Sequence, residues 1–127
     1  EMGKGFSSVD YINAQRARNV ITQKVDNLFD RYDFLLSPAQ LIGPPSPDNE
    51  TIKINGEELP RDINLIKPLV LSSLCGYPSI SIPFNKMKNG QYFSVQIIGR
   101  RNSDNKLMDF AKLLEKEFDL QYNNPLV

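Results

Sequence analysis

The sequence predicts an α/β fold in which helices pack on a sheet. Apolar residues recur every three or four positions in residues 9–30 and in residues 104–118, which is the spacing of an amphipathic helix. Between these segments, short apolar runs such as residues 34–37 and 79–83 are typical of strands. A chain of 127 residues is long enough for one domain, which we expect to comprise residues 1–127, and too short for two.

The composition excludes several classes of function. Fifteen basic and fifteen acidic side chains cancel, so no net field attracts nucleic acid or an anionic membrane. No apolar run approaches the roughly 18 residues that span a bilayer, and the single cysteine, Cys75, allows no internal disulfide. The absence of histidine excludes Ser-His-Asp and Cys-His catalysis within the chain, and it removes the commonest zinc ligand. We therefore expect a cytoplasmic protein with no metal, no cofactor, and no direct nucleic-acid or membrane partner.

The first predicted helix, residues 9–30, has one apolar face that we expect to be buried. Ser8 is the expected N-cap, because its side-chain oxygen can accept a hydrogen bond from an unpaired backbone N–H. The apolar face consists of Ala14, Ala17, Ile21, Val25 and Leu28.

Residues 34–37 are too few and too uniformly apolar for an exposed strand, which predicts a buried strand in a sheet covered on both faces. Pro38 ends this strand. The proline-rich residues 39–49 can neither extend a ladder nor form a helix, so they form a loop. In open α/β sheets, ligands bind at the carboxyl ends of strands, where this loop lies.

Residues 51–59 contain Asn55-Gly56 between two short β-type runs, which predicts a hairpin whose two turn positions have positive φ. Residues 65–74 are apolar on nearly every side and predict a helix buried on most sides. Pro68 should lie in the first turn of this helix or kink it.

Gly76 follows that helix and is expected to end it in the left-handed conformation. Residues 79–83 and 92–98 then predict two strands joined by a turn at Asn89-Gly90. In the second strand, Phe93, Val95 and Ile97 alternate with Ser94 and Gln96, so one face should be apolar and the other partly polar.

The last predicted helix follows Ser103, which we expect to be its N-cap. The inward face of this helix consists of Leu107, Ala111, Leu114 and Phe118. Residues 121–127 are expected to form a tail.

Several residues of reactive type have simpler structural interpretations. Cys75 has no histidine partner and is expected to be a small buried hydrophobe. Ser72 and Ser73, within an apolar helix, should bond to carbonyls of the preceding turn. The cluster Asp48, Glu50, Glu57, Glu58 and Asp62 does not have the spacing of oxygen ligands around a metal. Gly99-Arg100-Arg101 could contact a phosphate, but a turn between a strand and a helix explains these residues without a ligand.

Five segments together resemble the amidase-signature enzymes. Residues 75–83 resemble the turn Gly-x-Pro-(Ala/Ser)-(Ile/Val)-Ser-(Ile/Val)-Pro of that family, and residues 94–100 resemble its returning strand, which ends in Gln-(Leu/Ile)-(Ile/Val)-Gly. Residues 11–18 resemble its Ala-Gln-x-x-Arg helix, and residues 31–38 its Tyr-Asp-x-Leu-Leu-Thr-Pro strand; residues 107–118 are similar to its closing helix. The resemblance implies part of the mixed-sheet amidase-signature fold, with helices packed on the sheet.

The resemblance also implies a function. In that family a lysine and two serines hydrolyse a carboxylic amide, and all three precede the matched region, so no catalytic residue is expected here and the chain alone should be inactive. Segments matching this chain help to wall the acyl pocket. The positions expected near substrate are Pro38, Ala39, Gln40, Leu41, Ser73 and Cys75, although the position of Ser73 is frequently Asn in the family.

Three interpretations remain open. We favour the C-terminal part of a general amidase. The segments at residues 13–18 and 31–38 also resemble the A subunit of glutamyl-tRNA(Gln) amidotransferase, but that subunit usually carries Asp where this chain has Ile66. The third interpretation is a non-catalytic interaction domain from a split or truncated amidase. The chain begins with Glu1, which suggests a cut or processed piece. Its expected partners are the N-terminal remainder of the amidase or a second copy of the chain, and a small amide substrate.

Overall fold

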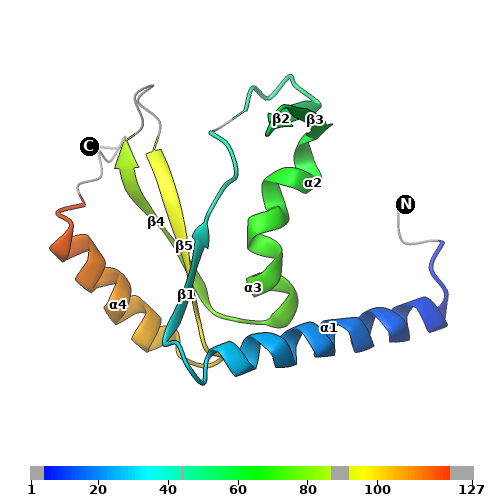
Figure 1. Cartoon of the computed structure of the whole chain (residues 1–127), viewed down its shortest axis with the longest axis horizontal. Coiled ribbons are helices and arrows are strands. Elements are labelled where there is room, and N and C mark those ends of the chain that lie inside the picture. The colour runs from blue at the N-terminus through cyan, green and yellow to red at the C-terminus, as the bar shows by residue number, and fades with distance from the viewer. Residues whose placement is uncertain (1–4, 44, 87–91, 121–127) are drawn as a thin grey trace.

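The computed structural model describes residues 5–43, 45–86 and 92–120, and it confirms the α/β class with helices on a sheet (Figure 1). The elements in chain order are α1 (Ser8–Leu28), β1 (Phe34–Pro38), β2 (Thr51–Ile54), β3 (Glu57–Pro60), α2 (Arg61–Ile66), the 3-10 helix η1 (Lys67–Leu69), α3 (Val70–Cys75), β4 (Ser79–Lys86), β5 (Tyr92–Gly99) and α4 (Asp104–Glu117). The expected turn at Asn89-Gly90 and the expected tail at residues 121–127 lie outside the described residues.

The main sheet has the order β1-β5-β4, and both pairings are antiparallel. Leu36 of β1 lies opposite Ile97 of β5, and Ile82 of β4 lies opposite Val95. The register of β4 shifts between Pro83 and Asn85. A segment near the start of the chain and two near its end are thereby joined in one sheet.

Each face of the sheet has its own apolar core. On one face, α4 contributes Leu107 and Ala111, which are buried against Ile82 and Ile97. The other face contacts α1 and α3 through a cluster of Val25, Phe29, Cys75, Tyr77 and Ile98. The alternation along β5 predicted from the sequence is confirmed, because Val95 and Ile97 pack in the cluster on the α4 side, whereas Gln96 bonds to Ser72 of α3.

The N-cap of α1 is Ser7, so the prediction of Ser8 is wrong by one residue. The Asp10 N–H donates to Ser7 Oγ at 3.2 Å, and the Ser7 N–H donates to the Asp10 carboxylate at 2.9 Å. This reciprocal capping box requires an acceptor side chain three residues after the cap. Ser7 has Asp10 there, whereas Ser8 would have Tyr11.

The apolar face of α1 is only partly buried, contrary to expectation. Val25 is buried, but Ile21 and Leu28 are each 40% exposed, and Ala14 and Ala17 are also exposed. Figure 1 shows the reason for the two alanines: the first half of α1 extends past the sheet and α3, and no described element packs on it. The helical period was therefore predicted correctly, and the burial was not.

The predicted apolar helix at residues 65–74 is a helical segment interrupted at Pro68, where the 3-10 helix η1 separates α2 from α3. Gly76 ends it as predicted, with φ 72° in the left-handed region. The expectation of burial on most sides is wrong for the described structure, because Ile66 is 50% and Leu74 45% exposed.

Two further expectations are corrected and one is confirmed. Strand β1 is not covered on both faces, because Leu36 is 62% exposed. Ser103 occupies the N-cap position of α4, but its hydroxyl donates to the Arg100 carbonyl at 2.6 Å and does not cap the helix. The β2–β3 hairpin is confirmed, with positive φ at both Asn55 and Gly56.

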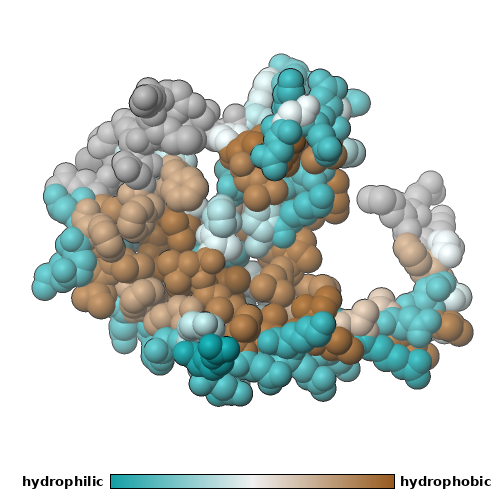
Figure 2. All heavy atoms as spheres, viewed as in Figure 1, coloured by the Kyte–Doolittle hydropathy of each residue, from teal (hydrophilic) through white to brown (hydrophobic). Residues whose placement is uncertain are grey.

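Figure 2 shows apolar side chains clustered over the sheet and α4 and continuing toward α3. Within the described residues, no helix is both long enough and apolar enough to cross a membrane.

Candidate functional site

The loop after β1 forms the first part of the candidate site. Ala39 is 5% exposed, and its N–H donates to the Ser94 carbonyl of β5 at 2.9 Å, which anchors the start of the loop. Pro38, Gln40 and Leu41 are exposed around it. Gln40 and Leu41 line a hollow of about 110 Å³ together with Ile42, Gly43, Tyr92, Phe93 and Ser94.

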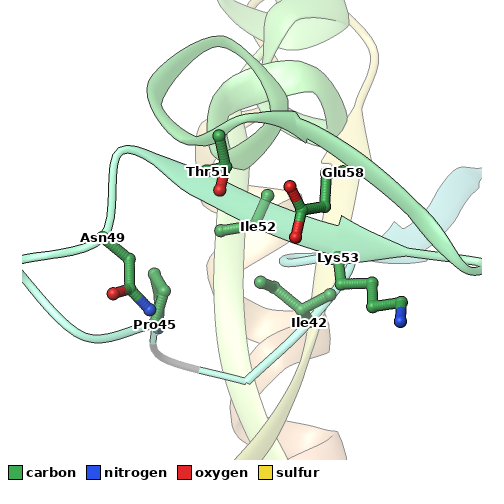
Figure 3. A pocket seen from close by; sticks show the side chains of 7 residues that line it. All are labelled: Ile42, Pro45, Asn49, Thr51, Ile52, Lys53 and Glu58. Atoms are coloured by element: carbon green, nitrogen blue, oxygen red, sulfur yellow. The ribbon is translucent and has the colours of Figure 1, made fainter.

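A second hollow, of about 270 Å³, adjoins the first through Ile42 (Figure 3). It lies between residues 42–49 and the β2–β3 hairpin. Its walls are Ile42, Pro45, Asn49, Thr51, Ile52, Lys53 and Glu58. Ile52 is buried at 5% exposure, whereas Lys53 and Glu58 are exposed. The two hollows share Ile42 and are lined by both apolar and polar side chains.

Ser73 and Cys75 lie elsewhere. They line a hollow of about 390 Å³ between α1 and the end of α3, with Arg18, Asn19, Thr22, Leu74, Gly76 and Arg101. Cys75 is 7% exposed and belongs to the apolar cluster under α1, as the sequence predicted for a small buried hydrophobe. Four of the six expected substrate-pocket residues are thus divided between two hollows that share no lining residue, Gln40 and Leu41 in one and Ser73 and Cys75 in the other, whereas Pro38 and Ala39 line neither.

A buried polar network connects the sheet to α3. Gln96 of β5 is 3% exposed; its Nε2 donates to Ser72 Oγ at 3.1 Å and to Ser79 Oγ at 3.3 Å. Its Oε1 accepts from Ser37 Oγ at 3.2 Å. Ser72 Oγ donates in turn to the Leu69 carbonyl at 3.0 Å, as expected for a serine in an apolar helix. The sequence analysis did not predict this network. The one feature of the sequence that could have indicated it is an amide side chain, Gln96, among the apolar residues of β5.

The turn after β5 is held by two carboxylates, Asp26 near the end of α1 and Asp30 just after it. Arg101 forms a salt bridge with Asp26 and lies over the ring of Tyr77, with the guanidinium carbon 5.3 Å from the ring centroid. Arg100 Nη2 contacts Asp30 at 2.5 Å. Both arginines therefore have carboxylate partners within the chain, and their positions need no phosphate ligand as an explanation.

Tyr77 is the titratable group with the largest perturbation in this region. Burial, followed by the hydrogen bond to Asp26, raises the pKa of Tyr77 to about 12. The phenol donates to the Asp26 carboxylate at 2.8 Å and lies 3.1 Å from the Thr22 carbonyl. Both acceptors favour the protonated phenol, so this group serves as a structural donor that ties the segment after α3 to α1.

The described residues hold no assembled catalytic centre of the lysine-and-serine type. The buried hydroxyl of Ser72 bonds to Gln96 and Leu69, neither of which is a base. Within residues 5–43, 45–86 and 92–120, no group of three or more His, Cys, Asp or Glu side chains could hold a metal ion. The arrangement therefore offers walls and rigid support, and no nucleophile activated by a neighbouring base.

Comparison with known proteins identifies the family. The family description "Amidase" matches residues 1–108. The A subunit of glutamyl-tRNA(Gln) amidotransferase from Borreliella afzelii is 28% identical over 123 residues, covering 94% of this chain and 24% of that protein. Fatty acid amide hydrolase of Medicago truncatula is 26% identical over 113 residues, covering 89% of this chain and 19% of that protein.

The fold agrees with these matches. A crystal structure of an amidase superposes with a TM-score of 0.84 at 23% identity, covering 91% of this chain and 26% of that one. The chain spans about a quarter of the length of these A-subunit relatives. Since the family match covers 108 of the 127 residues and the same elements recur in the same arrangement, the chain belongs to the amidase-signature family.

Proposed function

We propose that this chain is the C-terminal part of an amidase-signature hydrolase that cleaves a carboxylic amide, and that it supplies a wall of the acyl pocket and part of the core. One observation carries the proposal: the family match extends over residues 1–108 of a chain about a quarter as long as its relatives. The lysine and two serines would belong to the rest of the longer polypeptide. The working protein would be cytoplasmic, and its substrate a small amide.

In the proposed reaction, a serine hydroxyl attacks the amide carbonyl while the lysine accepts its proton through the second serine. Backbone N–H groups bind the oxyanion. The C–N bond breaks, the amine leaves with the relayed proton, and water hydrolyses the acyl-enzyme. The loop at residues 38–41 would contact the acyl group, with Ala39 fixing the loop to β5. Ser73 and Cys75 would approach substrate from the separate hollow beside α1.

A general amidase is favoured over the amidotransferase A subunit. By the resemblance, that subunit has Asp where this chain has Ile66, and the Asp would hold the amino group of the substrate. Ile66 is 50% exposed and apolar, so it offers no charge to an ammonium group. The proposed substrate is therefore an amide without a required amino group. The A subunit remains the second candidate, because relatives with that name match over 94% of the chain.

Complementation tests the proposal. The purified chain would be mixed with the Borreliella afzelii A subunit from which the matched quarter has been removed, and the hydrolysis of simple aryl and fatty amides would be followed. We expect no turnover by either part alone and turnover by the mixture that a serine-directed reagent abolishes. The Ile66→Asp variant should extend activity toward amides that carry an amino group.

Two outcomes would count against the proposal. Turnover by the isolated chain that survives mutation of Ser72, Ser73 and Cys75 would refute the assignment of catalysis to another segment. A stable complex without turnover would favour a non-catalytic interaction domain.

A further inference from the structure

We propose that the tip of the β2–β3 hairpin is a site of spontaneous covalent modification, at which Asn55 loses its side-chain amide through attack by the backbone nitrogen of Gly56. The product alters the hairpin that walls the hollow of about 270 Å³. This chemistry is independent of the proposed amide hydrolysis. The geometry of the turn, the exposure of both residues and the contrast with a second turn at Asn102 support the assignment.

The reaction needs a side-chain amide next to a backbone nitrogen that is not held in a ladder. Asn55 and Gly56 are the two loop residues between Ile54 and Glu57, which form the last pair of the β2–β3 ladder. In a two-residue hairpin loop, this closing pair exchanges the ladder hydrogen bonds. The Gly56 nitrogen therefore lies outside the ladder.

The surroundings of the turn also favour the reaction. Gly56 has no Cβ beside the attacking nitrogen, and beyond its chain neighbours no heavy atom lies within 4 Å of the place that a Cβ would take. Both loop residues are exposed, so water can enter and ammonia can leave. The hairpin forms a sheet of only two strands, the least stable kind of sheet. Local opening, which lets the Asn55 side chain turn toward the nitrogen, therefore costs little.

The steps of the reaction balance. The Gly56 nitrogen gives up its proton and bonds to Asn55 Cγ, the bond from Cγ to the side-chain nitrogen breaks, and that nitrogen leaves as ammonia. Water then opens the cyclic imide at either of its carbonyls. Opening at Cγ gives aspartate, whereas opening at the backbone carbonyl gives isoaspartate, in which the main chain runs through the side chain. The net change is uptake of water and release of ammonia, and it needs no oxidant or cofactor.

Each product changes the wall of the hollow. Aspartate adds a negative charge next to Glu57 and Glu58. Isoaspartate lengthens the main chain within a loop whose turn geometry matches the twist of the strands only at its ordinary length. The pairs Ile54–Glu57 and Ile52–Leu59 should then loosen. Because Ile52 is 5% exposed and lines the hollow, separation of its pair opens this wall.

Asn102 provides a contrasting turn within the same chain. It is exposed and has φ 62°, close to the φ of 50° at Asn55. The nitrogen that would attack its side chain belongs to Ser103, which has a Cβ and donates its N–H to the Arg100 carbonyl at 3.1 Å. Both features hinder attack. Asn102 should therefore keep its amide under conditions in which Asn55 loses it.

Peptide mapping by mass spectrometry tests the site on the 127-residue chain. The chain would be aged in buffer at about pH 8, where base assists removal of the amide proton. The conversion of amide to carboxylate would be followed at each asparagine, with isoaspartate and aspartate peptides separated by chromatography. We expect Asn55 to convert at least about tenfold faster than Asn102.

Amide hydrogen exchange measured by NMR tests the effect on the hairpin. Since bonded and non-bonded pairs alternate from the closing pair, Ile52–Leu59 is a bonded pair. The Ile52 amide should exchange at least about tenfold faster in the isoaspartate form than in the fresh chain. The amide of Ile97, in β5 of the other sheet, is the internal reference.

Asn55→Gly is the matched control variant, because Gly-Gly suits the same turn and has no amide to lose. Ageing should leave the exchange of its Ile52 amide unchanged. The chain contains a second Asn-Gly pair, Asn89-Gly90, which this variant keeps. The variant therefore separates the effect of Asn55 from any change at Asn89.

Three results would overturn the proposal. Loss of the amide at Asn102 as fast as at Asn55 would show that the hairpin turn has no special reactivity. An intact Asn55 in a chain that has converted Asn89 would show that the folded hairpin protects its asparagine. Unchanged Ile52 exchange in the isoaspartate form would refute the effect on the hollow. All three are read on this chain alone, so they stand whether or not a longer protein hydrolyses amides.

Discussion

The Gln96 amide nitrogen donates to Ser72 Oγ at 3.1 Å and thereby joins the central strand β5 to α3 across a buried surface. The same side chain contacts Ser37 of β1 and Ser79 of β4. One amide therefore fixes the positions of two neighbouring strands and of the helical segment over them. Because β1 leads into the loop of the candidate site, this network also determines where that loop begins.

Replacing Gln96 with Leu should destabilise the chain by about 1–3 kcal/mol, because buried hydroxyls lose their partner. Urea unfolding followed by circular dichroism measures the change. Gln23→Leu, on an exposed part of α1, is the matched control and should stay within about 0.5 kcal/mol of the parent. Equal midpoints for the two variants would show that the network contributes nothing to stability.

Gly76→Ala should cost about 1 kcal/mol or more, because Gly76 has φ 72° and a Cβ is disfavoured there. No heavy atom lies within 4 Å of the position that the new Cβ would take, so the cost is conformational and not steric. Gly76→Asn is the control, because Asn adopts the left-handed conformation more readily. A Gly76→Ala protein as stable in urea as the parent would mean that α3 ends differently.

Stability should fall as the pH rises from about 10 to about 12, because the pKa of Tyr77 is raised from its ordinary value of 10.0 to about 12. In this interval the unfolded phenol loses its proton while the folded phenol keeps it. The contribution of Tyr77 is therefore fully present below pH 10 and is lost as the pH approaches 12.

Thermal unfolding between pH 8 and about pH 11.5 measures this dependence on pH. Tyr77→Phe should be less stable than the parent at pH 8, by about 1 kcal/mol for the lost hydrogen bond, and should show a shallower decline above pH 10. Tyr11→Phe, at a position 65% exposed, controls for the removal of a phenol. Parallel profiles for the parent and Tyr77→Phe would contradict the assignment to Tyr77.

Mutations in the complemented enzyme can distinguish the contributions of the two parts of the expected substrate pocket to activity. We expect Leu41→Ala to lower kcat/KM by about tenfold, equivalent to 1.4 kcal/mol, if the loop after β1 contacts the acyl group. Ser73→Ala should have a smaller effect, because Ser73 lines the separate hollow beside α1. Leu113→Ala serves as the exposed control. A larger loss for Ser73→Ala would place the substrate beside α3 instead.

Local features of this protein follow from the sequence by itself. The Asn55-Gly56 turn, the left-handed Gly76 and the break at Pro68 were all predicted correctly, because each depends on the dihedral preferences of one or two residues. The helical period of α4 also predicted that Leu107 and Ala111 face the sheet. The motifs around residues 75–83 and 94–100 indicated the family through residue order alone.

Burial and contacts were decided by the tertiary structure. The apolar stripe of α1 and the apolar segment from α2 to α3 predicted burial, yet Ile21, Ile66 and Leu74 are exposed in the described structure. The assignment of Gln40 and Leu41 to one hollow, and of Ser73 and Cys75 to another, depends on how distant strands and helices pack. A periodic pattern determines which side of an element is apolar, whereas only the assembled elements determine what covers that side.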